Sequence, residues 1–311
     1  MSRDTSLETT RSLPSYGGQA VLEGVMMRGS RTCAIAVRSP EGSIVYKDVP
    51  LGALYRSRLA RLPFIRGLFV LWDSLVLGVS ALTFSANVQA GEEEPIDPRS
   101  MALTMLIALV LGVGFFFLLP AALSHLLESV VGWHSWWANL AEGFFRLALL
   151  IGYIWAIGRL SDIERVYGYH GAEHKTINAF EAGVDLTPER VKSFPREHPR
   201  CGTAFLLTVV VFSILLFSVL GPLPLVPKLL SRLILLPLLA ALAYEYIRFT
   251  ARLLPYRWAT PLVAPNLWLQ RLTTREPDET MLEVAIAAFK KMREAENLDA
   301  GSAVLASPTS S

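Results

Sequence analysis

Four apolar runs set the strongest limit on how this chain of 311 residues can fold. Each run reaches the roughly 20 mostly apolar residues that a helix needs to cross a bilayer. They lie at residues 101–123, 139–160, 203–225 and 229–250. Hydrophobic residues make up 52% of the chain and charged residues only 18%, which is too apolar for an ordinary soluble domain. We therefore predict a mainly α-helical, polytopic membrane protein with two transmembrane hairpins, 101–160 and 203–250.

The distribution of Lys and Arg orients these runs. Residues 125–137 contain neither, whereas the connections 56–66, 159–200 and 248–275 contain several basic residues. Because basic loops stay on the cytoplasmic side of a membrane, we expect both termini and residues 161–202 to lie in the cytoplasm. The formal net charge of +2 gives no reason to expect a nucleic-acid partner, since the arginines follow the apolar runs instead of forming one stripe.

The N-terminal region is predicted to form a small β-rich cap over residues 16–55. Cys33–Val37 and Ser43–Val49 are short β-rich runs separated by turn-forming residues at 39–42, a pattern typical of a hairpin. The glycine-punctuated run Gly17–Gly29 is predicted to be a third strand or a close-packed loop. A cap of roughly 40 residues is too small to be stable alone, so we expect it to pack on the rest of the protein.

The segments between and after these parts have weaker patterns. Residues 56–100 combine a basic stretch, an apolar run at 67–88 that contains Asp73, and an acidic loop, which favours an in-plane or partly inserted helix. Residues 251–297 are predicted to be an interfacial segment followed by an amphipathic helix. The two Ser/Thr-rich ends are predicted to be disordered tails: 1–15 and 298–311.

The residues with the most distinctive chemistry lie in the segment 161–202. His170 and His174 are four residues apart, so on a helix they share one face and can bind one metal ion. His198 and Cys201 form a second pair at a spacing common in zinc half-sites. Imidazole nitrogens and a thiolate suit zinc. We predict a zinc site held by His170, His174 and Cys201, with His198 or Glu245 completing it.

Three acidic residues have predicted roles around this site. Glu173 lies between the two histidines, and the pattern His-x-x-Glu-His matches the inverted zinc-protease signature, so we predict Glu173 as the catalytic general base. Glu245 lies in the last apolar run, where an isolated carboxylate is costly, and is predicted to be a further ligand or the partner of a histidine. Glu23 is predicted to be either a buried partner for Arg28 or an acid that reaches the site.

Two other interpretations of these residues stay open. The same side chains could form a hydrogen-bonded cluster that joins the segment 161–202 to the membrane helices without a metal. The two cysteines, Cys33 and Cys201, do not make a disulfide framework and are expected to be reduced or metal-bound. A transporter is the weakest hypothesis, because Asp73, Glu245 and Arg248 are the notable charges near the apolar runs and are too few to line a path.

Several blocks of the sequence carry a family likeness: Gly17–Gly29, His170–Lys175, His198–Thr203 and Trp268–Thr274. Together they resemble the YqhQ-like family of bacterial membrane proteins of unknown function, over about residues 15–297. The resemblance implies a multi-pass protein of the bacterial inner membrane. The family is labelled a predicted metal-dependent enzyme, which implies a metal but neither a reaction nor a substrate.

Two classes of function follow from these features. The leading hypothesis is a membrane-embedded, zinc-dependent, hydrolase-like enzyme with its site at the cytoplasmic membrane boundary. Its substrate would lie near the lipid headgroups and would be a lipid or a peptide. The alternative is a non-catalytic membrane scaffold or assembly factor that uses the cap and the segment 161–202 to bind a cytoplasmic protein partner.

Overall fold

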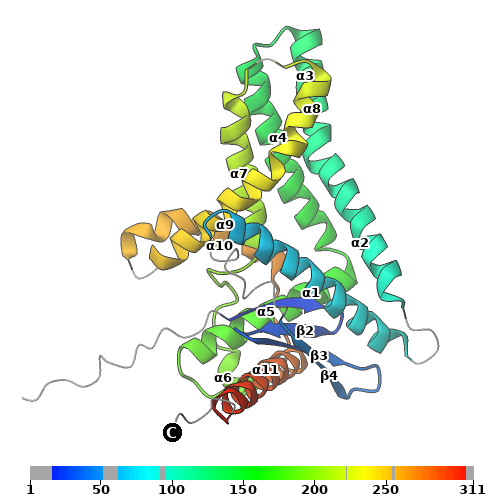
Figure 1. Cartoon of the computed structure of the whole chain (residues 1–311), viewed down its shortest axis with the longest axis vertical. Coiled ribbons are helices and arrows are strands. Elements are labelled where there is room, and N and C mark those ends of the chain that lie inside the picture. Colours follow the sequence, from blue (N-terminus) through cyan, green and yellow to red (C-terminus); the bar gives the residue numbers. More distant parts are fainter. Residues whose placement is uncertain (1–15, 52–61, 92–95, 222, 254–255, 306–311) are drawn as a thin grey trace, which may run out of the picture.

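The chain forms a helical bundle and a head built around a β-sheet (Figure 1). The computed structural model describes residues 16–51, 62–91, 96–221, 223–253 and 256–305. The predicted disordered tail at 1–15 lies outside these residues. The protein is mainly helical with a small N-terminal antiparallel sheet, as the sequence predicts.

Four antiparallel strands form the sheet in the order β1-β2-β3-β4. They are β1 (Gly17–Val21), β2 (Gly24–Arg28), β3 (Thr32–Arg38) and β4 (Ile44–Pro50). The β3–β4 hairpin has the predicted turn, closed where the Ser39 N–H donates to the Ser43 carbonyl at 2.8 Å. The run Gly17–Gly29 is two strands and not one, because Leu22 and Glu23 form a tight turn in which Glu23 has a φ of 51°.

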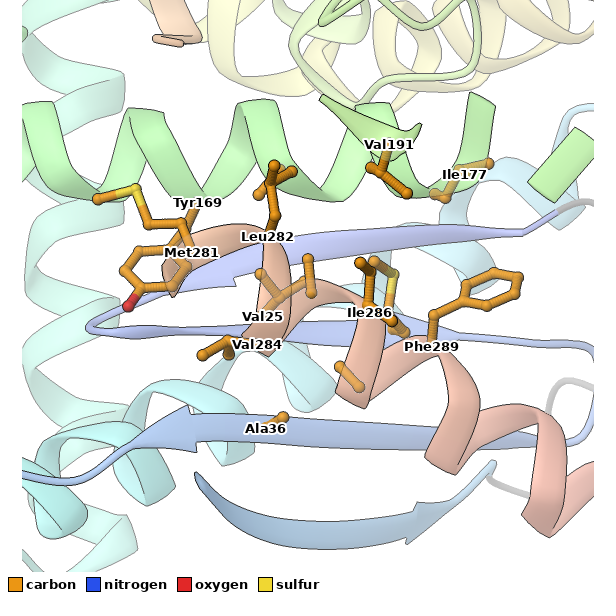
Figure 2. Packing of buried hydrophobic residues seen from close by; sticks show 14 of the residues in the cluster. Val25, Ala36, Tyr169, Ile177, Val191, Met281, Leu282, Val284, Ile286 and Phe289 are labelled. Carbon is orange, nitrogen blue, oxygen red and sulfur yellow. The ribbon is translucent and has the colours of Figure 1, made fainter. Parts of the chain in front are cut away.

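Helices cover both faces of this sheet. Successive residues of a strand point to opposite faces, so β2 divides its apolar residues between two clusters. Val25 packs with α5 (Ser161–Glu181) and α11 (Glu279–Leu305), through residues such as Leu282 and Phe289 (Figure 2). Met26 packs with α1 (Ile65–Ala90) through Leu77 and Ala81. The head is therefore a three-layer arrangement, which supplies the packing that the small sheet needs.

The predicted amphipathic helix is α11. Its apolar face is buried in the head, since Leu282 and Phe289 are almost fully covered. The helix continues to Leu305, so residues 298–305 of the predicted disordered tail 298–311 are helical, and residues 306–311 lie outside the described part of the chain. A short helix, α6 (Pro188–Val191), lies beside α11 and completes this side of the head.

The bundle contains the apolar helices. They are α2 (Pro98–Val113), the π-helical turn η4 (Gly114–Leu118), α3 (Leu119–Val131), α4 (Ser135–Ile157), α7 (Thr203–Val219), α8 (Leu225–Ile234) and α9 (Leu236–Leu253). By length and composition, three helical stretches could cross a membrane: Ile65–Ala90, Pro98–Val131 and Ser135–Ile157. The pair α8–α9 adds a fourth if its 41° bend is counted within one span. The fourth predicted run is therefore broken, and α7 is a shorter apolar helix of 17 residues.

One face of α1 packs against the sheet. Asp73 receives a hydrogen bond from Arg28 at 2.6 Å, and Gln89 donates to the Arg38 carbonyl at 2.7 Å. The other face exposes large apolar side chains, with Trp72 at 62% of its surface. The helix thus lies across the sheet between the head and the bundle (Figure 1).

A buried ionic network lies inside the bundle, which the sequence analysis did not anticipate. Arg146 on α4 and Arg232 on α8 both donate to Glu142, at 2.6 Å and 2.7 Å, and all three side chains are at most 2% exposed. Arg146 also donates to the Phe116 carbonyl in the π-helical turn at 2.9 Å and to Ser213 at 2.8 Å. Glu142 and Arg146 are four residues apart on α4, so this pair is a local signal that the sequence analysis overlooked. Arg232 lies 90 positions away, and only the packing of the bundle brings it to Glu142.

Candidate functional site

The candidate site lies where α5 of the head meets the first turn of α7 and the last turn of α10 (Thr260–Thr273). The segment between α6 and α7 closes it. A short 3-10 turn, η5 (Arg257–Ala259), leads into α10. The site therefore combines residues from parts of the chain that are far apart in sequence, at the boundary between head and bundle.

His170 and His174 lie one turn apart on α5, with ring centroids 4.4 Å apart. The Nδ1 atom of His170 lies 2.9 Å from the Thr273 carbonyl, and that of His174 lies 2.6 Å from the Arg196 carbonyl. A carbonyl oxygen only accepts hydrogen bonds, so both Nδ1 atoms donate, which in the neutral imidazole leaves Nε2 as the acceptor nitrogen. This arrangement is the one that proteins use to orient metal-binding histidines.

Cys201 brings a sulfur atom to the same point. Its Sγ lies 3.2 Å from His170 Nε2, and the Thr203 N–H at the start of α7 donates to it at 3.4 Å. One donor atom from each of His170, His174 and Cys201 lies within 4.8 Å of the others. Ligand atoms of a tetrahedral zinc ion are about 3.3–3.7 Å apart. The group would therefore have to close by up to about 1 Å to hold a zinc ion.

His198 lies beside this triad but its ring has other partners. The ring centroids of His174 and His198 are 5.6 Å apart. The Nε2 atom of His198 is 3.3 Å from Arg200 and 3.8 Å from Glu181. Burial lowers the pKa of His198, which favours the neutral imidazole. Among the described residues, only His170, His174 and Cys201 have donor atoms close enough together to share a metal ion. His198 packs beside the His174 ring and is not one of these three.

Glu245 does not join the site in the described part of the chain. Its carboxylate forms a salt bridge with Arg66 at the start of α1, where Arg66 Nε donates to Oε1 at 2.7 Å, and it also accepts from the Phe64 N–H at 3.1 Å. The expected role of Glu245 as a ligand or histidine partner has no support in this geometry. The carboxylate in the last apolar helix is instead compensated by an arginine of the segment 56–66 and ties α9 to α1.

Glu173 is the buried acid of the site, with only 4% of its surface exposed. Burial raises the pKa of Glu173 to about 7, against the opposing effects of the His170 imidazole and the Gly18 N–H. Its Oε2 atom has no hydrogen-bond partner among the described residues. A buried carboxyl with a free oxygen beside a histidine can hold or release a proton near neutral pH.

Strand β1 closes the site over Glu173. A Cβ atom added at Gly18 would overlap the Met26 carbonyl oxygen of β2 and would lie 2.9 Å from the Glu173 Cδ, so only glycine lets the strand approach both this closely. The neighbouring Gly17 has open space at the same position. The run Gly17–Gly29, predicted to be a strand or a close-packed loop, thus has a packing reason for a glycine at position 18.

Helix α10 provides two further residues that the sequence reasoning missed. The Gln270 side chain donates to the His198 carbonyl at 2.9 Å and accepts from the His198 N–H at 2.8 Å. Thr273 supplies the carbonyl that orients His170. Both residues lie in the block Trp268–Thr274, so the family resemblance was the signal that could have found them.

Glu23 has a different role from both of its predicted ones. It accepts hydrogen bonds from Arg165 and, at 3.1 Å, from the Tyr169 hydroxyl on α5. Arg28 binds Asp73 instead. The β1–β2 turn places Glu23 at the edge of the head, where it joins the sheet to α5.

Comparison with known proteins agrees with the blocks of resemblance. The model of a family described as "Protein of unknown function (DUF1385)" matches residues 62–295. The "Uncharacterized protein YqhQ" of Bacillus subtilis (strain 168) is 33% identical over 301 residues, which cover 92% of this chain and 94% of that protein. No solved structure matches the chain. The chain therefore belongs to the DUF1385 family, the YqhQ-like proteins whose function is unknown.

Proposed function

We propose that this protein is a zinc-dependent, hydrolase-like enzyme of the bacterial inner membrane, with its site at the cytoplasmic membrane boundary. The apolar helices α2–α3, α4, α7 and α8–α9 would cross the bilayer, and α1 would lie in its plane. The basic connections favour a cytoplasmic position for the head and both termini. The site lies between head and bundle, so it would meet the headgroup layer. A lipid or a peptide held near the headgroups is the substrate that fits this depth.

The observation that carries the proposal is the geometry of three donor atoms. His170 and His174 are each fixed through Nδ1 by a backbone carbonyl, and Cys201 Sγ lies in contact with His170 Nε2. Three protein ligands leave one coordination position for a substrate or water, as in catalytic zinc sites. A zinc ion held there would polarise a carbonyl or phosphoryl oxygen and lower the pKa of a water molecule.

The other residues of the site would position groups and move a proton. Glu173 would take a proton from the attacking water on its free Oε2 and return it to the leaving group. Gln270 would hold the segment that carries His198 and Cys201, because its amide binds both the N–H and the carbonyl of His198. Gly18 would keep β1 over Glu173 and exclude bulk water from that side.

Metal analysis of the purified full-length protein tests this proposal. We expect about one zinc ion per chain, with loss of zinc in His170→Ala and His174→Ala. Glu173→Gln should keep the zinc and fail to complement a strain that lacks the gene. His134→Ala is the matched control, because His134 lies at the start of α4 and should leave zinc unchanged. Wild-type protein that takes up no zinc on reconstitution would exclude the zinc-dependent enzyme.

The scaffold alternative predicts a different pattern of complementation. A side chain at Gly24 would come within 2.8 Å of a Val37 methyl group and would separate β2 from β3. If the cap binds a cytoplasmic partner, Gly24→Val should abolish complementation while Glu173→Gln complements fully. If the protein is an enzyme, neither Gly24→Val nor Glu173→Gln should complement the strain that lacks the gene.

The contact between His170 and Cys201 supports a second candidate, a thiol nucleophile. Cys201 Sγ would attack an acyl carbon while its proton passes to His170 Nε2, and the leaving group would then take that proton. The Thr273 carbonyl orients the imidazole, as the third member of a triad does. In zinc-free protein, alkylation of Cys201 by iodoacetamide should then slow in His170→Ala. Cys33 is an internal control, because burial raises its pKa to about 12.

A further inference from the structure

A basic and aromatic segment without acidic residues runs from residue 246 to residue 275. It contains five arginines and no Asp or Glu: Arg248, Arg252, Arg257, Arg271 and Arg275. In the structure this segment comprises the second half of α9, η5 and α10, which we call the arm. The arm extends sideways from the bundle at the level where bundle and head meet, in orange in Figure 1. Within it, the Tyr246 hydroxyl donates to the Leu262 carbonyl at 3.2 Å.

Helix α10 of the arm has a mostly apolar outer face. Its buried residues are both apolar and polar, with Val263 and Leu269 beside Asn266 and Gln270. The exposed residues are Thr260, Pro261, Leu262, Ala264, Pro265, Trp268 and Arg271. Contact with water disfavours an exposed face of this composition. The outer face of α10 is therefore built for an apolar medium, which a lipid bilayer provides.

The exposed aromatic residues of the arm suit the boundary of such a medium. Trp258 is 64% exposed and Trp268 is 52% exposed. Tyr256, beside Trp258, stacks with it at a centroid distance of 6.3 Å. Trp and Tyr are enriched at the headgroup level of membranes, because one end of each ring system is polar. These residues place the arm in the interface and not in the hydrocarbon core.

The positive charge of the arm indicates which kind of lipid headgroup it would contact. Arg252 is exposed in the last turn of α9, one turn after Arg248, and Arg271 is exposed on α10. Arg271 also binds Glu197 at 2.9 Å, and Arg275 turns inward to the Gly158 carbonyl, so these two are partly used by the protein. Arg248 also lies close enough to act on the Glu245 carboxylate, but that carboxylate already has Arg66 as its ion-pair partner. Arg248 and Arg252 are therefore the pair beside the exposed Phe249. Arginines next to interfacial aromatic residues fit phosphate-bearing, anionic headgroups.

We infer that the arm lies on an anionic lipid surface, with the outer face of α10 among the acyl chains and Arg248 and Arg252 among the headgroups. The excess of positive charge favours this occupant over a second copy of the chain, whose arm would bring the same charges together. The inference stands apart from the zinc proposal, because it uses the outer face of α10 and not the residues that contact the histidines.

Quenching of tryptophan fluorescence by brominated lipids tests the inference on full-length protein in nanodiscs. The difference between wild type and Trp268→Phe isolates the signal of Trp268. We expect brominated phosphatidylglycerol to quench it more strongly than brominated phosphatidylcholine. Arg248→Gln with Arg252→Gln should reduce this preference about 25-fold, since each arginine near an anionic surface contributes roughly fivefold. Arg190→Gln, an exposed arginine of the head, should leave it unchanged.

Two results would overturn the inference. Equal quenching by the two lipids in wild type, with no effect of the double variant, would show that the arm has no preference for anionic headgroups. An unchanged total lipid quenching in Trp268→Phe would show that the outer face of α10 does not touch lipid. If mass photometry then finds two chains in each disc, a second copy covers the arm instead.

Discussion

Two buried polar clusters in this protein differ in how completely their atoms are paired. In the bundle, Glu142 is bound by Arg146 and Arg232, and the remaining guanidinium donors reach Phe116, Ser213, Ser231 and Asn139. At the boundary, the Nδ1 atoms of His170 and His174 are paired and His170 Nε2 lies against Cys201 Sγ, but Glu173 Oε2 has no hydrogen-bond partner among the described residues. The carboxylate of the bundle cluster is bound by two arginines, whereas the carboxyl of the boundary cluster keeps an unpaired oxygen.

This difference separates a structural cluster from a candidate functional one. A buried network in which every donor is paired leaves nothing for a ligand, and it joins the helices that contribute to it. A buried carboxyl oxygen without a partner, such as Glu173 Oε2, is costly unless something binds it. The bundle cluster is therefore expected to control stability, and the boundary cluster to control binding of a metal.

The largest effect should come from removing the single carboxylate of the bundle cluster. Glu142→Gln leaves two buried guanidinium groups without a counter-charge, which should lower the free energy of unfolding by about 3–5 kcal/mol. Thermal unfolding in detergent measures this loss. The zinc content of the folded fraction should stay at the wild-type level. A variant as stable as wild type would mean that the bundle cluster does not stabilise the fold.

A smaller effect should follow from loosening the support of the boundary cluster. Gln270→Leu removes both hydrogen bonds to the His198 backbone, so the segment that carries Cys201 loses its anchor. Zinc affinity should fall about 10–100-fold, as for other supporting residues of metal sites. Competition with a chelating dye measures the affinity. Asn139→Leu is the matched control, because it removes a buried amide of the bundle cluster and should leave zinc affinity unchanged.

Two neighbouring glycines give the next contrast. Gly18→Ala places a methyl group against Glu173 and the backbone of β2, and overpacking of this kind costs about 1–3 kcal/mol. Gly17→Ala meets open space and should be close to neutral. Denaturant unfolding of the two variants measures the difference. Equal losses would show that β1 does not press on Glu173 as the structure has it.

The smallest effect concerns an ion pair at the edge of the head. Arg165 and burial act on Glu23 with the net result that its pKa is lowered. A lowered pKa in the folded state adds stability that is present at neutral pH and is lost as the pH falls through that folded-state value. Because the pair is partly exposed, we expect less than about 1 kcal/mol. Glu23→Gln should remove this part of the acid dependence of the midpoint in urea, and an unchanged acid dependence would contradict the assignment.

Much of the secondary structure follows from local patterns in the sequence. The β3–β4 hairpin, the helical runs of the bundle and the apolar face of α11 were predicted, because turn residues and the spacing of apolar residues are local signals. The histidine pair on α5 was found for the same reason, since residues four apart on a helix share a face. The second strand within Gly17–Gly29 was missed, because a two-residue turn at Leu22 and Glu23 carries no glycine or proline.

The pairing of charges could not be read from local patterns. Glu245 was predicted to be a metal ligand or a histidine partner, but it forms a salt bridge with Arg66. Glu23 was predicted to pair with Arg28 or to reach the site, but it forms a salt bridge with Arg165. Residues such as Glu142 and Arg232 are 90 positions apart, and only helix packing brings them to one point. Long-range pairing depends on the relative placement of helices, which no short window of sequence encodes.

The sequence by itself determined that apolar helices dominate, that a small sheet precedes them, and that two histidines share one helix face. The tertiary structure alone decided that Cys201 meets those histidines while Glu245 does not, and that α10 supplies Gln270 and Thr273. The physical reason is that helix and strand periodicity act over a few residues, whereas a site needs side chains from several elements to converge. Convergence is set by how the layers pack, and packing is a property of the whole chain.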